Sequence, residues 1–167
     1  MDVYIIRHAD AGEPDPKKYP DDRMRPLSVD GKTDMLRVAR GMRRLGIEFD
    51  QLIDSGYVRA RQTSECICDA YEFKPSAIKT MEELAPETDP AQTVAALRRL
   101  RSVQSVALVG HQPHLGGFVG YAIAANPDLP LELKKAGVCW LNLKRFAGGG
   151  SMLMALFPPK PLRKLGK

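Results

Sequence analysis

Two of the three histidines in this 167-residue chain directly follow short apolar segments. His8 comes after VYII and Arg7, and His111 comes after the run SVALVG. Apolar runs of this length are typical of buried strands, so each histidine is expected at a strand exit. A third such segment, FDQLID, is followed by Ser55 and then by Arg59. Ligands bind beyond the carboxyl ends of parallel strands, and we expect these side chains to meet at that edge.

Imidazoles and guanidiniums gathered in this way are suited to a phosphoryl group. Guanidinium groups donate bidentately to phosphate oxygens, and the N-termini of helices add backbone donors for an anion. A neutral imidazole is a good nucleophile towards phosphorus near neutral pH, whereas a protonated imidazole can hold the oxygens of the transferred group. The pattern therefore predicts that one histidine attacks phosphorus and the other stabilises the phosphoryl charge.

The remaining metal-ligating residue types are assigned to packing. His114 lies inside the helix expected after His111, and H-Q-P-H without a nearby carboxylate or thiol is a weak zinc motif. The three cysteines, Cys66, Cys68 and Cys139, are an odd number with C-x-C spacing. They predict neither a disulfide framework nor a structural zinc site, and they are typical of a reducing cytoplasm.

Strand patterns and helix patterns alternate along the chain. The expected strands cover residues 3–6, 49–54, 77–80, 105–110, 138–143 and 152–156. The expected helices cover residues 31–46 with Ser28 as N-cap, 57–71, a segment opened by Asp89 and Pro90, and a segment opened by Pro113. This order predicts a single α/β domain with helices on both faces of a mostly parallel sheet, edged by an antiparallel terminal hairpin. The irregular segment from Gly12 to Arg25 predicts an exposed loop near the site.

The net charge of +5 comes mainly from the end of the chain. Without Lys160, Arg163, Lys164 and Lys167, 21 bases face 20 acids. We therefore predict a nearly neutral domain over residues 1–158 and a basic, Pro-rich tail over residues 159–167 that lies on the surface or frays. No apolar stretch approaches the ~20 residues of a membrane span, and the N-terminus lacks a signal-peptide pattern. The expected protein is cytoplasmic, with neither a nucleic-acid nor a membrane partner and with its oligomeric state open.

Several motifs resemble those of the histidine phosphatase superfamily, which has the phosphoglycerate-mutase-like fold, and especially its small SixA-type phosphohistidine phosphatases. RHA at residues 7–9 resembles the R-H-G signature, and residues 25–31 resemble R-x-L-[ST]-x-x-G. Residues 55–63 resemble S-P-x-x-R-A-x-Q-T, residues 109–113 resemble the second-histidine motif, and KKAG at 134–137 also resembles SixA-type relatives. The resemblance implies that His8 becomes phosphohistidine, that His111 is the second histidine, and that Arg7 and Arg59 bind the phosphate.

Three positions test this resemblance. Ala9 replaces the signature glycine, and its methyl group is expected to crowd the phosphate if its φ is positive. Gly56 replaces the proline of S-P-x-x-R. Larger relatives use a glutamate from between the two histidines as general acid, and Glu83 is the candidate here. The alternative is that no dedicated acid is required, because the N–P bond of phosphohistidine is labile once the leaving nitrogen is protonated.

The chain has no room for the inserted helical segments that enclose small phosphates in mutases and sugar-phosphate phosphatases. The resemblance then implies an open rim and a phosphohistidine phosphatase acting on a phosphorylated phosphotransfer protein. Neutral His8 would attack phosphorus, Arg7, Arg59 and protonated His111 would neutralise the oxygens, and water would hydrolyse phospho-His8, without metal or other cofactor. One alternative is a phosphatase or mutase for a small phosphate metabolite, with the loop from Gly12 to Met24 closed over the site. A second alternative is a catalytically weak phosphoprotein-binding module.

Overall fold

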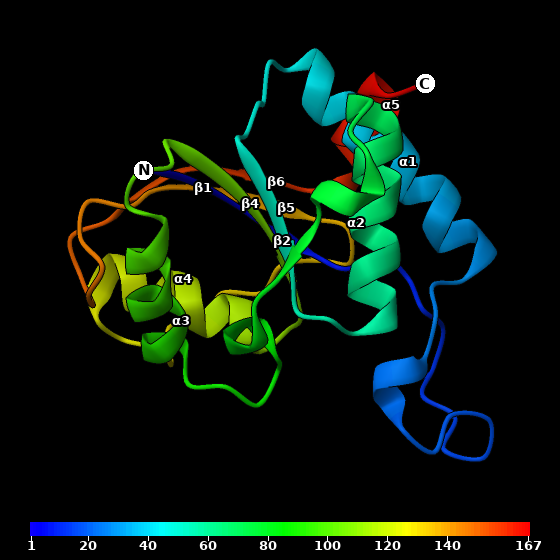
Figure 1. Cartoon of the computed structure of the whole chain (residues 1–167), viewed down its shortest axis with the longest axis horizontal. Coiled ribbons are helices and arrows are strands. Elements are labelled where there is room, and N and C mark those ends of the chain that lie inside the picture. The colour runs from blue at the N-terminus through cyan, green and yellow to red at the C-terminus, as the bar shows by residue number, and fades with distance from the viewer.

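The computed structural model describes residues 1–167 and contains a six-stranded sheet with helices on both faces (Figure 1). The strands are β1 (Asp2–Arg7), β2 (Gln51–Asp54), β3 (Lys79–Thr80), β4 (Ser105–Gly110), β5 (Val138–Asn142) and β6 (Met152–Phe157). Their order in the sheet is β3-β2-β4-β1-β5-β6. The first four pair in parallel, whereas β5 and β6 pair antiparallel at one edge. The predicted α/β class and its antiparallel edge are confirmed.

Five α-helices flank the sheet, and two of them begin at the side-chain caps that the sequence indicates. They are α1 (Val29–Arg44), α2 (Val58–Tyr71), α3 (Pro90–Ala96), α4 (His114–Ala124) and α5 (Pro159–Leu165). Ser28 accepts a hydrogen bond from the Gly31 N–H at the start of α1, and Asp89 accepts one from the Ala91 N–H at the start of α3. None of the helices is long and apolar enough to cross a membrane.

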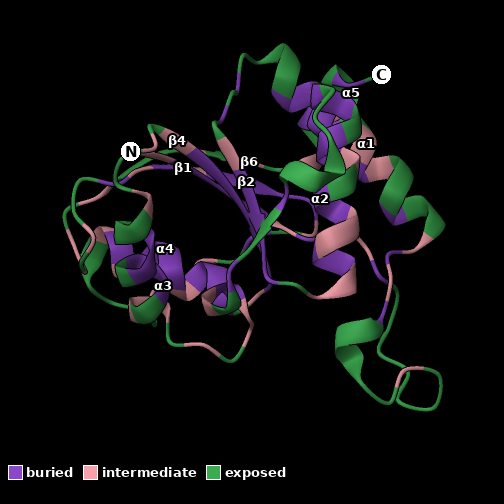
Figure 2. Ribbon diagram, viewed as in Figure 1, coloured by how far each residue is buried: buried purple, intermediate pink, exposed green.

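The central strand β1 separates two hydrophobic cores. Tyr4 and Ile6 pack on the side of α1, α2 and α5, whereas Val3 and Ile5 pack on the side of α3 and α4. All four side chains are buried, and Figure 2 shows the central strands of the sheet as a buried layer between the two groups of helices. Burial on both faces explains why β1 is a continuous apolar run rather than an alternating one.

The register of β1 against β4 brings the two predicted reactive histidines together. Arg7 lies opposite Gly110 in this parallel pair, so His8 and His111 leave neighbouring strands at the same level. The His8 N–H continues the pairing by donating to the Gly110 carbonyl at 3.0 Å. On the other side of β4, Asp54 lies opposite Val109, which places the start of α2 at the same edge.

The C-terminal segment is not the surface tail that its composition predicts. Its residues form α5, which packs against α1, and Leu162 is buried in the same core as α1. A Cβ atom at Gly41 would lie 2.1 Å from the Leu162 carbonyl oxygen, so α1 needs a glycine at this crossing. The prediction was wrong because Pro159 and Pro161 lie in the first turn of the helix, where proline is tolerated.

Replacing Leu162 by alanine tests whether α5 is part of the folded core. Removing a fully buried leucine side chain is expected to lower the free energy of unfolding by about 2–5 kcal/mol. Leu165→Ala, in the same helix but at a side chain that is 41% exposed, is the matched control and is expected to change it by only about 0.5 kcal/mol. Equal small effects in denaturant titrations of both variants would show that α5 is not docked in solution.

Candidate active site

A cationic cavity of about 310 Å³ opens where β1 and β4 end. Four cationic side chains line it, while Glu13 is the one acidic residue among its walls. The cations are Arg7, Arg25, Arg59 and Lys135, and the two imidazoles of His8 and His111 complete the set. The predicted convergence of Arg7, His8, Arg59 and His111 is thus what the fold produces.

His8 has one ring nitrogen held and the other free. Its Nδ1 lies 2.7 Å from the Ala9 carbonyl oxygen, which can only accept, so Nδ1 carries the proton and donates. The lone pair is therefore on Nε2, the atom available for attack. Burial lowers the pKa of His8 to about 4 against the opposing hydrogen bond to Ala9, and the charges of Arg59 and Arg7 lower it further. The imidazole is neutral at physiological pH, as a nucleophile must be.

Long-range proton–nitrogen NMR spectra of the free protein can measure this state of His8 directly. We expect the Nδ1–H tautomer near neutral pH and a titration midpoint near 4, well below the ordinary value of about 6.5. The charged form becomes populated only as the pH falls towards that midpoint, so the neutral nucleophile persists at mildly acidic pH. An Nε2–H tautomer, or a midpoint near 6.5, would contradict the assignment of Nε2 as the attacking atom.

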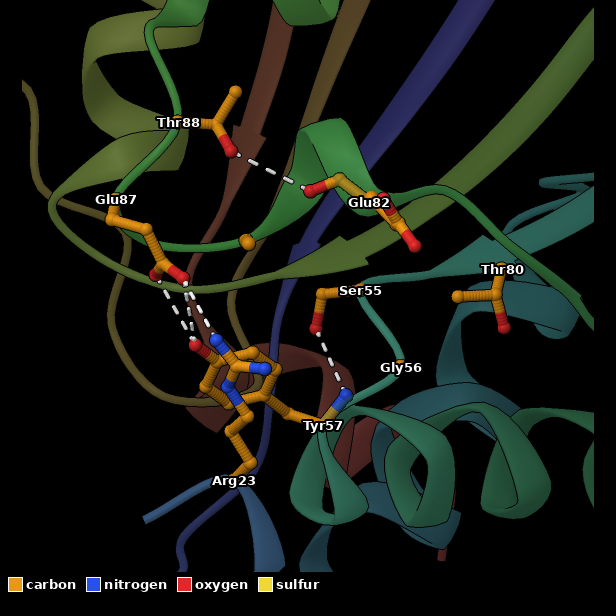
Figure 3. A pocket seen from close by; sticks show the side chains of 9 residues that line it. Arg23, Ser55, Gly56, Tyr57, Thr80, Glu82, Glu87 and Thr88 are labelled. Atoms are coloured by element: carbon orange, nitrogen blue, oxygen red, sulfur yellow. Dashed lines mark hydrogen bonds and ion pairs between the residues drawn. The ribbon is translucent and has the colours of Figure 1, made fainter. Parts of the chain in front are cut away.

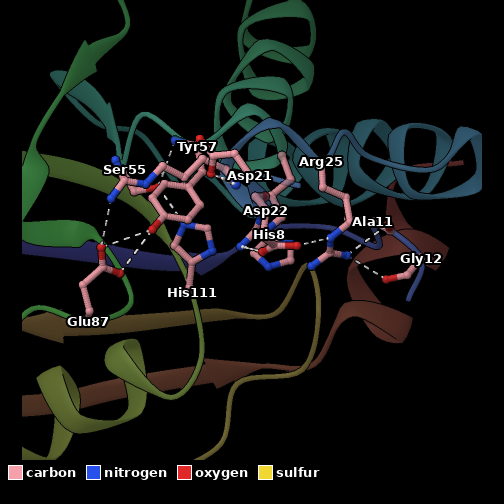
Figure 4. A network of polar contacts seen from close by, with 12 residues as sticks. His8, Ala11, Gly12, Asp21, Asp22, Arg25, Ser55, Tyr57, Glu87 and His111 are labelled. Atoms are coloured by element: carbon pink, nitrogen blue, oxygen red, sulfur yellow. Dashed lines mark hydrogen bonds and ion pairs between the residues drawn. The ribbon is translucent and has the colours of Figure 1, made fainter. Parts of the chain in front are cut away.

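His111 lies against His8 but has a different hydrogen-bond partner, Ser55 (Figure 4). The two ring centroids are 5.0 Å apart. The Nε2 atom of His111 is 2.7 Å from the Ser55 hydroxyl oxygen, and its ring centroid is 4.7 Å from that of Tyr57. Its buried Nδ1 has no hydrogen-bond partner within the chain.

The protonated state expected of His111 belongs to the site with a phosphoryl group bound, and in the free site this histidine is neutral. Burial, followed by the charges of His8 and Arg59, lowers the pKa of His111 to about 2, and the imidazole is neutral here. A bound phosphoryl dianion would supply the opposite charge and raise this pKa.

The two predicted phosphate-binding arginines are preorganised by backbone and carboxylate contacts. Arg59 is 5% exposed in the first turn of α2; its Nη1 donates to the Asp22 carbonyl at 2.6 Å, and its Nη2 lies 3.0 Å from the Asp22 carboxylate. Arg7 donates through Nη1 to the Leu133 carbonyl at 2.8 Å. The Nε atoms of both arginines are buried without a partner. These held guanidiniums are suited to an oxyanion because their orientation is already fixed.

The structure adds site residues that the sequence analysis did not assign as ligands. Arg25 was quoted only within a motif before the first helix, yet it is buried and lines the cavity. Its Nε donates to the Asp22 carboxylate at 2.7 Å (Figure 4). The same carboxylate also contacts Arg59. The Arg25 hydrogen bond holds the pKa of Asp22 below its usual value, and this aspartate is a counter-ion with which a phosphoryl group would compete. Lys135, from the KKAG motif, lies 2.6 Å from Asp10.

Glu83, the predicted general acid, is not brought to this cavity. Its carboxylate lies 2.7 Å from Arg99, and both residues line a different cavity. The Thr93 hydroxyl donates to the Glu83 carbonyl, which holds this short turn in place. Proximity in sequence could not reveal the direction of the side chain. Glu87, in the same segment, accepts a hydrogen bond from the Tyr57 hydroxyl at 3.1 Å, and the ring of Tyr57 packs on His111.

The two departures from the family motifs are accommodated in different ways. Ala9 is fully buried but does not have a positive φ, and its N–H donates to Thr63 Oγ1 at 3.1 Å, so the expected crowding does not arise. Gly56 has φ of +82°, a conformation closed to the proline of the motif. His114 has the packing role predicted for it, since its ring nitrogens lie 3.0 Å from Thr93 Oγ1 and 2.9 Å from the Thr88 carbonyl.

The loop before α1 borders the cavity without covering it. Gly12, Glu13 and Pro14 contribute to the cavity wall, whereas most of the following residues are exposed. Figure 1 shows this loop, in blue, projecting away from the sheet and helices. The cavity is therefore open to solvent at its rim.

Comparison with known proteins places these features in a wider context. No family model matches the chain. The chain is 34% identical over 144 residues to an uncharacterised protein of Picosynechococcus sp., covering 85% of each. It is 31% identical over 126 residues to the phosphohistidine phosphatase SixA of Escherichia coli, covering 74% of this chain and 73% of that protein.

Solved structures share the whole architecture. The protein histidine phosphatase SixA complexed with tungstate aligns with a TM-score of 0.83 and 25% identity, covering 97% of this chain and 99% of that one. A putative alpha-ribazole-5'-P phosphatase from Escherichia coli aligns with a TM-score of 0.73 and 14% identity, covering 95% and 97%. The first alignment confirms the predicted phosphoglycerate-mutase-like fold, and the second shows how widely that fold is shared.

Proposed function

Because the chain belongs to the histidine phosphatase superfamily and is SixA-like, we propose that it removes the phosphoryl group from phosphohistidine on a phosphotransfer protein. The arrangement of His8 carries the proposal. Its Nδ1 donates to a carbonyl, its Nε2 is free, and burial among arginines keeps it neutral. A nucleophilic nitrogen beside fixed guanidiniums is what transfer through a phosphoenzyme requires.

In the proposed first step, the Nε2 lone pair of His8 attacks phosphorus. A new N–P bond forms while the N–P bond to the substrate imidazole breaks, and the leaving nitrogen takes a proton from water. In the second step the oxygen of a water molecule attacks phosphorus, so that a P–O bond forms as the N–P bond to His8 breaks and inorganic phosphate leaves. The proton lost by this water neutralises the hydroxide left by the first step, and the neutral imidazole of His8 is restored. No carboxylic acid is assigned to either step, because the leaving imidazole nitrogen is itself basic.

The cationic side chains around His8 would balance the phosphoryl charge in both steps. Arg7 and Arg59 have buried Nε–H groups without partners, and an oxyanion would accept from them. As the dianion binds, His111 would become protonated and donate as well. Asp22 would give up part of its contact with Arg59, so phosphate binding and displacement of this carboxylate are coupled.

The open rim favours a protein substrate. The loop from Gly12 to Met24 projects outward, so a phosphohistidine on a protein surface could reach Nε2 of His8 without closure of a lid (Figure 1). Three free cysteines are compatible with a cytoplasmic reaction. The alternative substrate is a small phosphate metabolite. Its support is the fold shared with the alpha-ribazole-5'-P phosphatase and the presence of Glu13 and Pro14 in the cavity wall.

Comparing substrates of different size tests the proposal. A small phosphate gains little binding energy beyond its phosphoryl group, whereas a protein can contact the rim. We expect kcat/KM for a phosphorylated histidine phosphotransfer domain to exceed that for phosphoglycerate or a sugar phosphate at least about 100-fold, roughly 2.7 kcal/mol. Equal or reversed ratios would favour the metabolite phosphatase. If no phosphoenzyme forms in a single turnover, the result would favour the other alternative, a catalytically weak module that binds phosphoproteins.

A further inference from the structure

A second cavity, of about 490 Å³, is lined by residues that contact the cavity of the histidines (Figure 3). Ser55 and Tyr57 lie in its wall, and both contact His111, which lines the first cavity. A group bound in the second cavity would therefore be separated from His111 only by the side chains of Ser55 and Tyr57. None of the proposed chemical steps uses this space.

The second cavity has the opposite charge balance. Its wall contains two carboxylates, Glu82 and Glu87, and one cation, Arg23. Glu82 is exposed and forms no ion pair within the chain, whereas Glu87 pairs with Arg23 and with the Tyr57 hydroxyl. The two cavities thus present a cationic site for a phosphoryl group and an acidic site.

Arg23 shows what kind of group the acidic cavity accepts. Its guanidinium carbon lies 5.7 Å from the centroid of the Tyr57 ring, and its Nη2 lies 3.6 Å from the Glu87 carboxylate (Figure 3). An aromatic face together with a carboxylate is a recurrent binding arrangement for a guanidinium or ammonium group. The chain's own arginine therefore occupies part of a cation site.

This occupant is weakly held. The side chains of Arg23 and Glu87 are 63% and 59% exposed, and exposed ion pairs of this kind contribute little free energy. Arg23 also lies in the loop that projects from the body of the molecule (Figure 1). A cation from another molecule can consequently replace it at small cost and would find Glu82 unpaired as well.

We propose that this cavity is a subsite for a basic side chain, arginine or lysine, that lies close to the phosphorylated residue of a protein substrate. The identity of that residue as phosphohistidine rests on the function proposed above. The preference for a cation is argued from the side chains of this cavity and does not depend on that identity. Substrate selection would then combine an anion in one cavity with a cation in the next.

Matched peptides test the subsite by binding, without requiring turnover. Each peptide carries a non-hydrolysable phosphohistidine analogue at its centre and a single arginine, placed in turn at each position within about three residues. Its partner carries citrulline, the uncharged isostere, at the same position. In the wild-type protein we expect one or more arginine peptides to bind about tenfold tighter than their citrulline partners, or ~1.4 kcal/mol.

Three variants separate the subsite from a general charge effect. Glu87→Gln is expected to reduce the preference to about twofold, whereas Arg23→Ala is expected to increase it, because it removes the competing guanidinium. Glu65→Gln removes an exposed carboxylate from α2 outside both cavities and is expected to leave the preference unchanged. A wild-type protein without an arginine preference, or a preference that Glu87→Gln leaves intact and Arg23→Ala lowers, would overturn the proposal. Hydrolysis of the corresponding phosphohistidine peptides tests the proposed function separately, so either can fail alone.

Discussion

Replacing His8 by alanine is expected to lower kcat/KM by about four decades, a loss of roughly 5.4 kcal/mol of transition-state stabilisation. The expectation follows from the free Nε2 of a neutral, buried imidazole, which no other group of the cavity can replace. His111 is the nearest candidate substitute, but its Nε2 is engaged with Ser55 and its ring belongs to the neighbouring strand exit. The covalent step should therefore be lost rather than slowed.

Single-turnover experiments with phosphorylated substrate distinguish the roles of the two histidines. His8→Ala should form no acid-labile phosphoenzyme, whereas His111→Gln, which keeps the nucleophile, should still form one at a reduced rate. Circular dichroism of both variants controls for folding. More than about a tenth of wild-type turnover in His8→Ala, or a phosphoenzyme that requires His111 and not His8, would refute the assignment.

The placement of the reactive residues could be predicted from sequence because it depends on topology. Apolar runs that end at Arg7, Asp54 and Gly110 are strands, and a parallel sheet brings their ends to one edge whatever the details of packing. The register of β1 with β4 then aligns His8 with His111. These features depend on the spacing of apolar residues, on the length of each apolar run and on the order of strands and helices along the chain. All three can be read from a single sequence.

Features that depend on side-chain direction or on summed charge could not be predicted in this way. The carboxylate of Glu83 turns to Arg99, and that of Asp22 turns to two arginines, although both residues lie in single turns of 3-10 helix with little to distinguish them in sequence. The neutral state of His111 depends on burial and on cations from several elements at once. Helix α5 was missed because its prolines suggested an irregular tail, and its contact with α1 is made at Gly41, over a hundred residues earlier in the chain.

Arg59→Lys is expected to lower kcat/KM about 100- to 1000-fold while keeping the charge. The guanidinium of Arg59 donates to the Asp22 carbonyl through one terminal nitrogen, pairs with the Asp22 carboxylate through the other, and lies 5.0 Å from the Tyr57 ring centroid. A lysine ammonium cannot keep these contacts and also donate two parallel hydrogen bonds to the phosphoryl oxygens. The loss should appear mainly in kcat, because fixed donors act most strongly on charge developing in the transition state.

Arg61→Lys is the matched control, two residues further along α2. Arg61 pairs with Asp54, is 32% exposed in its side chain and does not line the cavity of His8. The same substitution there is expected to leave kcat/KM within about threefold of the wild type, since no contact with the phosphoryl group is changed. If Arg59→Lys is folded and has kinetics close to the wild type, Arg59 does not bind the phosphoryl group. If both variants lose activity equally, the substitutions disturb helix α2, and the loss is not due to bidentate hydrogen bonding by Arg59.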